Sequence, residues 1–128
     1  MDHIIFIQKA KENLAAAKVC YSNNYYNACA NRLYYAMFQI AVAVLIYKGF
    51  PPTQGSIGHE WTQSTFAREL INRQKAIAGR FRAYLYDAQS LRNTADYYES
   101  GVSKKSVERQ LKKAEEFVTA LQLEVKSP

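Results

Sequence analysis

The sequence predicts a single all-α domain over residues 1–128. Apolar residues recur at three- and four-residue spacings along most of the chain, and no segment has the strict alternation of a strand. Only three prolines and five glycines interrupt these patterns. Because 48% of the 128 residues are hydrophobic, the chain can bury a substantial core. Five helices are expected.

A short polar segment separates the first two predicted helices. The first spans about residues 3–21 and carries an apolar stripe. Asn24 is a good N-cap for the second helix, because its side-chain oxygen can accept a free backbone N–H of the first turn. The second helix runs to Lys48 and ends at Gly49, which tolerates a left-handed conformation. The stripe of the first helix consists of Ile7, Ala10, Leu14, Ala17 and Tyr21.

The most apolar segment, Leu33 to Tyr47, lies within the second helix and has Gln39 as its one polar residue. A membrane-spanning helix needs about 20 such positions, and this segment is shorter. It is therefore predicted to be a core helix of a soluble, cytoplasmic protein without a membrane span. Cys20 and Cys29 are expected to be reduced, buried thiols, and no Cys/His spacing suggests a metal site or another cofactor.

A loop at residues 50–58, which begins with consecutive prolines, precedes the last three predicted helices. These helices span about residues 59–73, residues 80–98 and a segment that opens with Ser103 as N-cap. The seam of the fifth suits lengthwise packing on another helix, and with the stripe of the first it suggests a homodimer. The apolar stripe of the fourth helix contains Phe81, Leu85, Ala88, Leu91 and Ala95, and the seam of the fifth contains Val107, Leu111, Ala114, Val118, Leu121 and Val125.

Positive charge gives only local evidence of a nucleic-acid partner. The formal charge of +6 is spread evenly, with a surplus of two in each of residues 1–60, 61–100 and 101–128. Within residues 68–82, however, Glu69 alone offsets five cations, and such a cluster attracts phosphates. The more frequent role of such a run is an ordinary solvated helix face. The cations are Arg68, Arg73, Lys75, Arg80 and Arg82.

The segment from Leu91 to Tyr98 brings an arginine, an amide and phenols to the end of the fourth predicted helix. Arg92 and Asn93 together could grip a phosphate. Arg92 and Asp96 lie four residues apart, about 40° from each other on an ideal helix, so an intrahelical ion pair would satisfy both. Tyr97 lies about 140° from Arg92, so its phenol reaches the guanidinium only around a groove or at a frayed helix end.

Four segments in order resemble one family. Residues 31–38, NRLYYAMF, are similar to the RAYYAMF segment of HEPN-type prokaryotic proteins, and residues 56–59 resemble their TH-x-G region loosely. Residues 91–97, LRNTADY, match the LRxxADY element, and residues 113–118, KAEEFV, match the tail. The resemblance implies an up-and-down bundle of four main helices with a fifth short or C-terminal helix, often dimeric, whose arginine-containing element faces a cleft.

In active HEPN relatives, the resemblance implies, the arginine binds phosphate, the adjacent polar residue orients it, and a histidine supports metal-independent RNA cleavage. Arg92 and Asn93 match these positions, but Tyr97 stands where the histidine would be. Histidine titrates near pH 6.5 and tyrosine near pH 10, so an unperturbed phenol is a poor base at neutral pH. Tyr97 could still act as an acid or phosphate clamp. A weakened or altered ribonuclease with Arg92, Asn93 and Tyr97 as catalytic residues is one expectation.

Other residues have a structural and a functional interpretation. Tyr34, Tyr35 and Phe38 are more often core aromatics than platforms for stacked bases. Arg32, beside that core, should need an anionic partner, and Asp96 or a bound phosphate are the candidates. His59 is expected to be a helix-terminal residue with a solvent-facing ring; alternatively it supplies the imidazole missing at position 97. Ser56 has no convincing base beside it.

Two functions follow from these observations. The first is a HEPN-type domain of a toxin–antitoxin or defence module that binds RNA or nucleotide, with a small nucleotidyltransferase as the antitoxin partner that the resemblance implies. The second is a non-catalytic helical interaction module that forms a homodimer or docks such a partner. The expected nucleic-acid-binding residues are Arg32, Arg68, Arg73, Arg80, Arg82 and Arg92.

Overall fold

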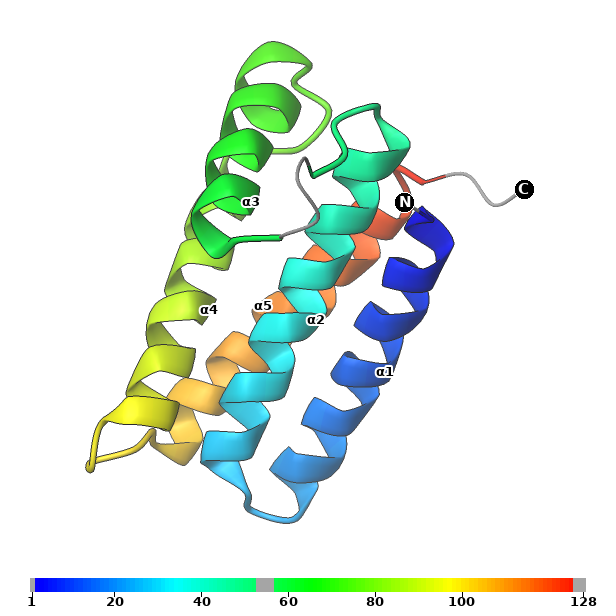
Figure 1. The fold of residues 1–128 in the computed structure, drawn as a ribbon. Coiled ribbons are helices and arrows are strands. Elements are labelled where there is room, and N and C mark those ends of the chain that lie inside the picture. The colour runs from blue at the N-terminus through cyan, green and yellow to red at the C-terminus, as the bar shows by residue number, and fades with distance from the viewer. Residues whose placement is uncertain (1, 53–56, 126–128) are drawn as a thin grey trace.

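The computed structural model describes residues 2–52 and 57–125, and all regular elements in these ranges are helices. α1 (His3–Ser22), α2 (Tyr26–Tyr47), α4 (Arg80–Tyr97) and α5 (Lys104–Gln122) form the long bundle. α3 (His59–Thr65) continues directly into η1 (Phe66–Arg73), and this pair covers one end of the bundle (Figure 1). The predicted all-α class is therefore confirmed.

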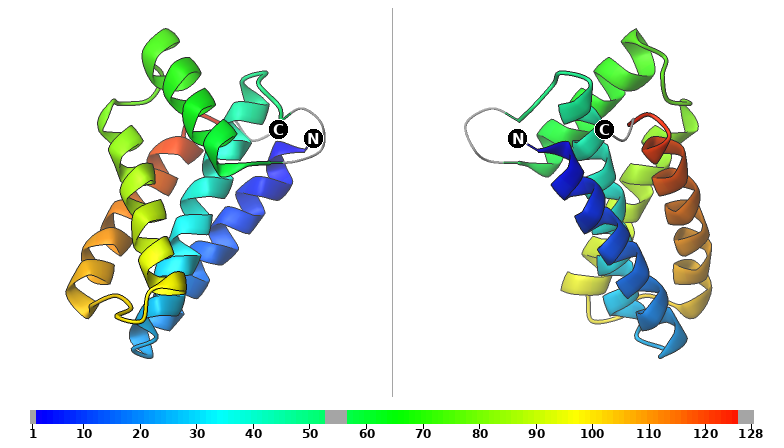
Figure 2. Two further views of the ribbon diagram at one scale, coloured as in Figure 1. Left: turned by 60° about the vertical axis from the view of Figure 1, so that its left-hand side comes forward. Right: turned by 90° about the vertical axis from the view of Figure 1, so that its right-hand side faces the viewer.

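α2 is the central helix of the bundle. It packs against α1, α4 and α5, as the two further views also show (Figure 2). Every residue from Ile40 to Leu45 is fully buried. α2 is long and apolar enough to cross a membrane, but 72% of its apolar window is buried inside the bundle, which is the packing of a core helix. Both cysteines are free, but only Cys29, on α2, is buried, and this burial raises the pKa of its thiol to about 12. The expectation of a buried thiol is wrong for Cys20, which is half-buried on α1.

The predicted helix boundaries are close to the observed ones, with one wrong cap. Asn24 adopts a left-handed φ of 63°, and its Oδ1 accepts a hydrogen bond from the Tyr26 hydroxyl instead of from a backbone N–H. α2 therefore begins at Tyr26, one residue later than an Asn24 cap would place it, and without a side-chain cap. Ser103 does cap α5, since its Oγ accepts from the Ser106 N–H at 3.2 Å. Gly49 has the expected positive φ, 95°.

The third predicted helix is an α-helix only over its first half. Residues 66–73 form a π-helix, and the Gln74 N–H continues its wider pattern by donating to the Glu69 carbonyl at 2.9 Å. Lys75, with a left-handed φ of 51°, follows it. Periodicity alone predicted one helix over residues 59–73, because a few wide turns leave the apolar spacing almost unchanged.

The seam of α5 lies inside the chain's own bundle. All six residues of the predicted seam are buried, and α5 packs mainly along α2. Each apolar side chain that suggested a dimer contact on α5 is therefore already covered within one chain. On α1, Ala10 and Ala17 are likewise fully buried. The α5 seam thus lies in the monomer core, whereas Ile7, Leu14 and Tyr21 of the α1 stripe are only half-buried against it. The homodimer stays a prediction.

Candidate functional site

Arg92 lies in the last turns of α4, with its guanidinium turned toward α2. Its Nη2 donates to the Tyr35 hydroxyl at 3.1 Å and its Nη1 to Asn93 Oδ1 at 3.2 Å. Its Nε lies 3.0 Å from Asp96 Oδ2, although the N–H does not point at that oxygen as a hydrogen bond requires. The arginine and aspartate side chains are only 15% and 24% exposed. The predicted ion pair thus forms, in a largely desolvated setting.

Tyr35 lies between two guanidinium groups. Arg92 Cζ is 5.4 Å from the centre of its ring, and Arg32 Cζ is 5.5 Å from the same centre. Both distances are within the range of cation–π attraction, which depends on the negative face of the aromatic ring. The half-buried phenol thus holds two arginines close together, one from its own helix and one from α4, despite their mutual repulsion.

Arg32 is held by neutral amides. Its Nη1 donates to Asn13 Oδ1 at 2.9 Å and its Nε to Asn31 Oδ1 at 2.9 Å, and its Nη2 also contacts Asn31 Oδ1. The expectation of a direct Asp96 partner is wrong, because Asn31 lies between them and donates to Asp96 Oδ2 at 2.9 Å. In the part of the chain that the structure describes, Asp96 pairs directly with Arg92 and reaches Arg32 only through Asn31.

This arrangement could take up an anion. The two arginines and Asp96 leave an excess of one positive charge in a partly buried region, and uncompensated charge in such a setting is costly. A phosphate oxygen would supply the missing charge, and guanidinium groups bind phosphate in two-point geometry. Asn93 and Tyr35, which already touch Arg92, orient its planar group.

Tyr97 is the last residue of α4 and is 70% exposed. Its ring centre nevertheless lies 5.5 Å from Arg92 Cζ. The helix ends here, because Tyr98 adopts an extended conformation with φ −107° and ψ 137°. The expectation that Tyr97 reaches Arg92 only at a helix end or around a groove therefore agrees with this contact.

His59 does not have the solvent-facing ring expected of it. Its Nδ1 lies 2.6 Å from the Tyr34 hydroxyl, and its ring centre is 4.9 Å from that of Phe38 and 6.1 Å from that of Tyr35. Burial lowers the pKa of His59, and the positive charge of Arg92 lowers it further. His59 is therefore neutral at pH 7 and separated from Arg92 by a single aromatic ring. Ser56, three residues earlier in the sequence, lies outside the described residues.

The tyrosine partner of His59 is part of the core. Tyr34 is fully buried, and this burial raises the pKa of its phenol. Tyr34 thus stays protonated. Its hydroxyl donates to His59 Nδ1 when Nε2 carries the imidazole proton, and accepts from Nδ1–H in the other tautomer. Phe38 is also buried, so Tyr34 and Phe38 are core aromatics as predicted. Tyr35 is half-buried at the edge of this cluster.

The arginines of the basic run, residues 68–82, contact different residues from those that contact Arg92. Arg73 Nη1 is 3.0 Å from Glu69 Oε1, and Arg68 Nε is 3.9 Å from the same oxygen. Arg80 pairs with Glu116 of α5, whose Oε1 lies 2.9 Å from its Nη2. Three of the four arginines predicted to bind nucleic acid in this run thus contact carboxylates of the protein. Arg82 is exposed and lines a groove beside α3 and η1.

Comparison with known proteins places the chain in a family. The family model described as HEPN domain matches residues 5–124. The chain is 32% identical over 91 residues to a protein of Methanocaldococcus jannaschii named "Putative toxin", an alignment of 71% of this chain and 58% of that relative. A second protein of that organism with the same name is 31% identical over 94% of this chain and 86% of its own length.

A third relative, the UPF0332 protein of Thermotoga maritima, is 29% identical over 90% of this chain and 84% of its own length. The family model covers nearly all of the chain, so the chain belongs to the HEPN domain family. The resemblance in the four sequence segments is thereby confirmed.

Proposed function

We propose that this chain is a HEPN-type domain of a prokaryotic toxin–antitoxin or defence module that acts in the cytoplasm and binds RNA or a nucleotide at Arg92. The observation that carries the proposal is the pair of half-buried arginines, Arg32 and Arg92, on one tyrosine, of which only Arg92 pairs directly with a carboxylate. The names of two relatives support the toxin part of the proposal. A homodimer and a small nucleotidyltransferase antitoxin belong to the same proposal.

Ribonuclease activity, if the domain has it, needs a group that accepts a proton near the bound phosphate. His59 suits this role better than Tyr97 when its Nδ1–H donates to the Tyr34 hydroxyl, because Nε2 is then unprotonated and free to accept a proton. Its neutral imidazole lies behind the Tyr35 ring that contacts Arg92. Tyr97 is highly exposed and suits the role of a clamp on the phosphate or base.

A second candidate function is the non-catalytic interaction module. It is favoured by the number of contacts that Arg92 already makes, since Tyr35, Asn93 and Asp96 surround its guanidinium. On this alternative Arg92 joins α4 to α2 and binds nothing else. The two candidates differ in what happens when Arg92 is removed.

The test is RNA binding by the full chain, measured by fluorescence anisotropy at several salt concentrations. Arg92→Ala should weaken binding about 10-fold or more, because a hydrogen bond to a charged group contributes about 1.5–3 kcal/mol, and the salt slope should fall by about one. Arg109→Ala is the matched control, because it removes one exposed arginine of α5 outside the site.

The control variant should keep most of the affinity. Equal RNA affinity of wild type and a folded Arg92→Ala variant would favour the interaction module. Incubation of the same RNA with wild type and His59→Ala addresses cleavage: activity that survives in His59→Ala and is lost in Tyr97→Phe would assign the proton chemistry to the tyrosine.

A further inference from the structure

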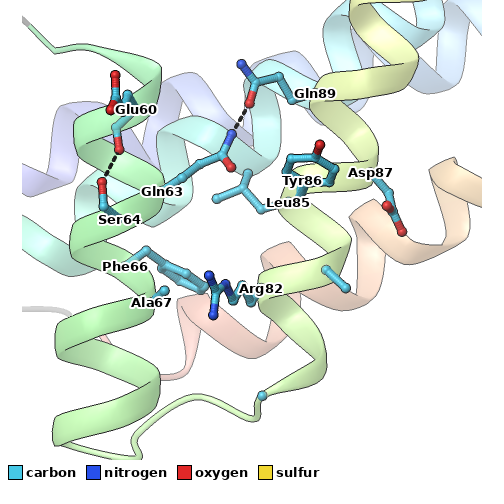
Figure 3. A pocket seen from close by; sticks show the side chains of 12 residues that line it. Glu60, Gln63, Ser64, Phe66, Ala67, Arg82, Leu85, Tyr86, Asp87 and Gln89 are labelled. Atoms are coloured by element: carbon cyan, nitrogen blue, oxygen red, sulfur yellow. Dashed lines mark hydrogen bonds between the residues drawn. The ribbon is translucent and has the colours of Figure 1, made fainter.

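A groove of about 630 Å³ runs between the α3–η1 segment and α4 (Figure 3). Its apolar side includes Phe66, Ala67 and Leu85. A hydrogen bond from Gln63 to Gln89 spans it from one helix to the other. Its volume lies within the range of about 300–1,000 Å³ that small-molecule sites occupy. None of the candidate catalytic residues lines this groove, so it is a separate feature of the surface.

The chemistry of the lining favours a planar, largely uncharged ligand. Two carboxylates, Glu60 and Asp87, and one guanidinium, Arg82, line the groove, so its local charge does not suit a phosphate. The amides of Gln63 and Gln89 can donate and accept hydrogen bonds. Carboxylates accept hydrogen bonds from the amino groups of nucleobases, and apolar side chains cover a flat ring.

Tyr86 adds an exposed aromatic surface to this lining. It is 62% exposed although it is a large side chain, and it belongs to the α4 wall (Figure 3). Bases of single-stranded nucleic acids stack on exposed aromatic rings of this kind. A phenol offers this surface to any base, because every base has a π-face.

The groove and Asn93, a hydrogen-bond partner of Arg92, lie along one side of α4. Tyr86, Gln89 and Asn93 follow at spacings of three and four, which keeps them within about 60° of one another on an ideal helix. Asn93 Oδ1 accepts the hydrogen bond from Arg92 Nη1. Tyr86 and Asn93 are about 10 Å apart along the helix axis, a distance that a short stretch of nucleotide chain spans.

We propose that the groove between α3–η1 and α4 binds a nucleobase of single-stranded RNA, which stacks on Tyr86 while a nearby phosphate of the same strand contacts Arg92. Gln63 and Gln89 hydrogen-bond the edge of the base, and Glu60 and Asp87 accept from its amino groups. This inference rests on the proposed function, since it assigns a base subsite to the strand that Arg92 holds.

The experiment measures the affinity of the full chain for a short single-stranded RNA and for copies in which one nucleotide at a time is abasic. In wild type, one or two abasic positions should weaken binding about 5-fold to 100-fold, the size of base–aromatic stacking. Tyr86→Ala should weaken binding of the intact RNA by a similar factor, and the abasic positions should then cost nothing more. Tyr25→Ala is the matched control, because Tyr25 is 63% exposed and does not line the groove.

A second variant tests whether the effect of Tyr86→Ala is direct. Ala83→Trp places a bulky ring in the groove at an exposed position of α4 and should also remove the abasic sensitivity. If Arg92→Ala weakens binding while Tyr86→Ala and the abasic scan change nothing, the base subsite is overturned and the proposed function stands. If no variant changes RNA affinity, both fall.

A protein occupant of the groove gives a different result. If Tyr86→Ala converts a dimer into a monomer in sedimentation while the abasic scan stays flat, a second copy of the chain covers the groove. That outcome also overturns the base subsite.

Discussion

The two groups of arginines in this chain differ in where they lie and in what neutralises them. The basic run of residues 68–82 is dense in the sequence, yet its ion-paired members are 57–73% exposed, and they contact Glu69 or Glu116. Arg32 and Arg92 are sixty residues apart in the sequence, yet both lie against one tyrosine, and Asp96 pairs directly with Arg92 alone.

A dense run of cations in a sequence therefore does not by itself locate an anion-binding site. Exposed arginines are solvated, and an ion pair exposed on both sides, such as Arg80–Glu116, contributes little, whereas Glu69 is itself buried. A partly buried arginine loses solvation, so each neighbouring charge matters more. The candidate site therefore lies outside the basic run, where the fold leaves positive charge incompletely compensated.

The largest effect is expected from removing the ring that joins the two inner arginines. Tyr35→Ala should lower the free energy of unfolding by about 2–4 kcal/mol, because it deletes a half-buried aromatic side chain and the acceptor of the Arg92 hydrogen bond. Tyr35→Phe keeps the ring and should cost about 1 kcal/mol. Urea denaturation of the three proteins measures this; equal costs for the two variants would contradict the role of the ring.

The charge comparison is sharpened by neutralising one carboxylate in each group. Asp96→Asn should destabilise the fold by about 1–3 kcal/mol, since Arg92 would keep a desolvated charge without its counterion. It should also strengthen RNA binding, because Asp96 competes with the phosphate. Glu116→Gln, which breaks the exposed Arg80 pair, should change stability much less. A larger loss in Glu116→Gln would reverse the comparison.

The smallest effect concerns the pH dependence of His59. Its pKa in the folded state is lowered by burial and by Arg92, so the folded state binds fewer protons than the unfolded chain just below pH 6.5. Stability should therefore fall as the pH drops from about 6.5 through the lower folded pKa, and His59→Gln should remove this dependence.

An NMR titration separates the two arginine groups through the same histidine. Arg92→Ala should move the pKa of His59 up toward its ordinary value, whereas Arg73→Ala should leave it unchanged. A shift in the Arg73→Ala variant alone would mean that the outer run, not Arg92, sets the charge at His59.

Most of the helices could be predicted because their signals are local. The stripe of α1, the seam of α5 and the Ser103 cap each depend on neighbours within a few turns of the same helix. The Arg92–Asp96 ion pair is local in the same sense, since four-residue spacing sets it. The Asn24 cap failed because the residue took a left-handed turn conformation that suits asparagine equally well.

The helical class, the buried character of α2 and the Arg92 element could be predicted from the residues alone, because apolar periodicity and short motifs do not depend on the packing partners. The contacts of Arg32 and Arg92 with Tyr35, the packing of His59 on Tyr34 and Phe38, and the burial of the α5 seam within one chain follow only from the packed fold. These contacts join residues tens of positions apart, and their energies depend on burial and on the surrounding charges, which are fixed only when the helices pack.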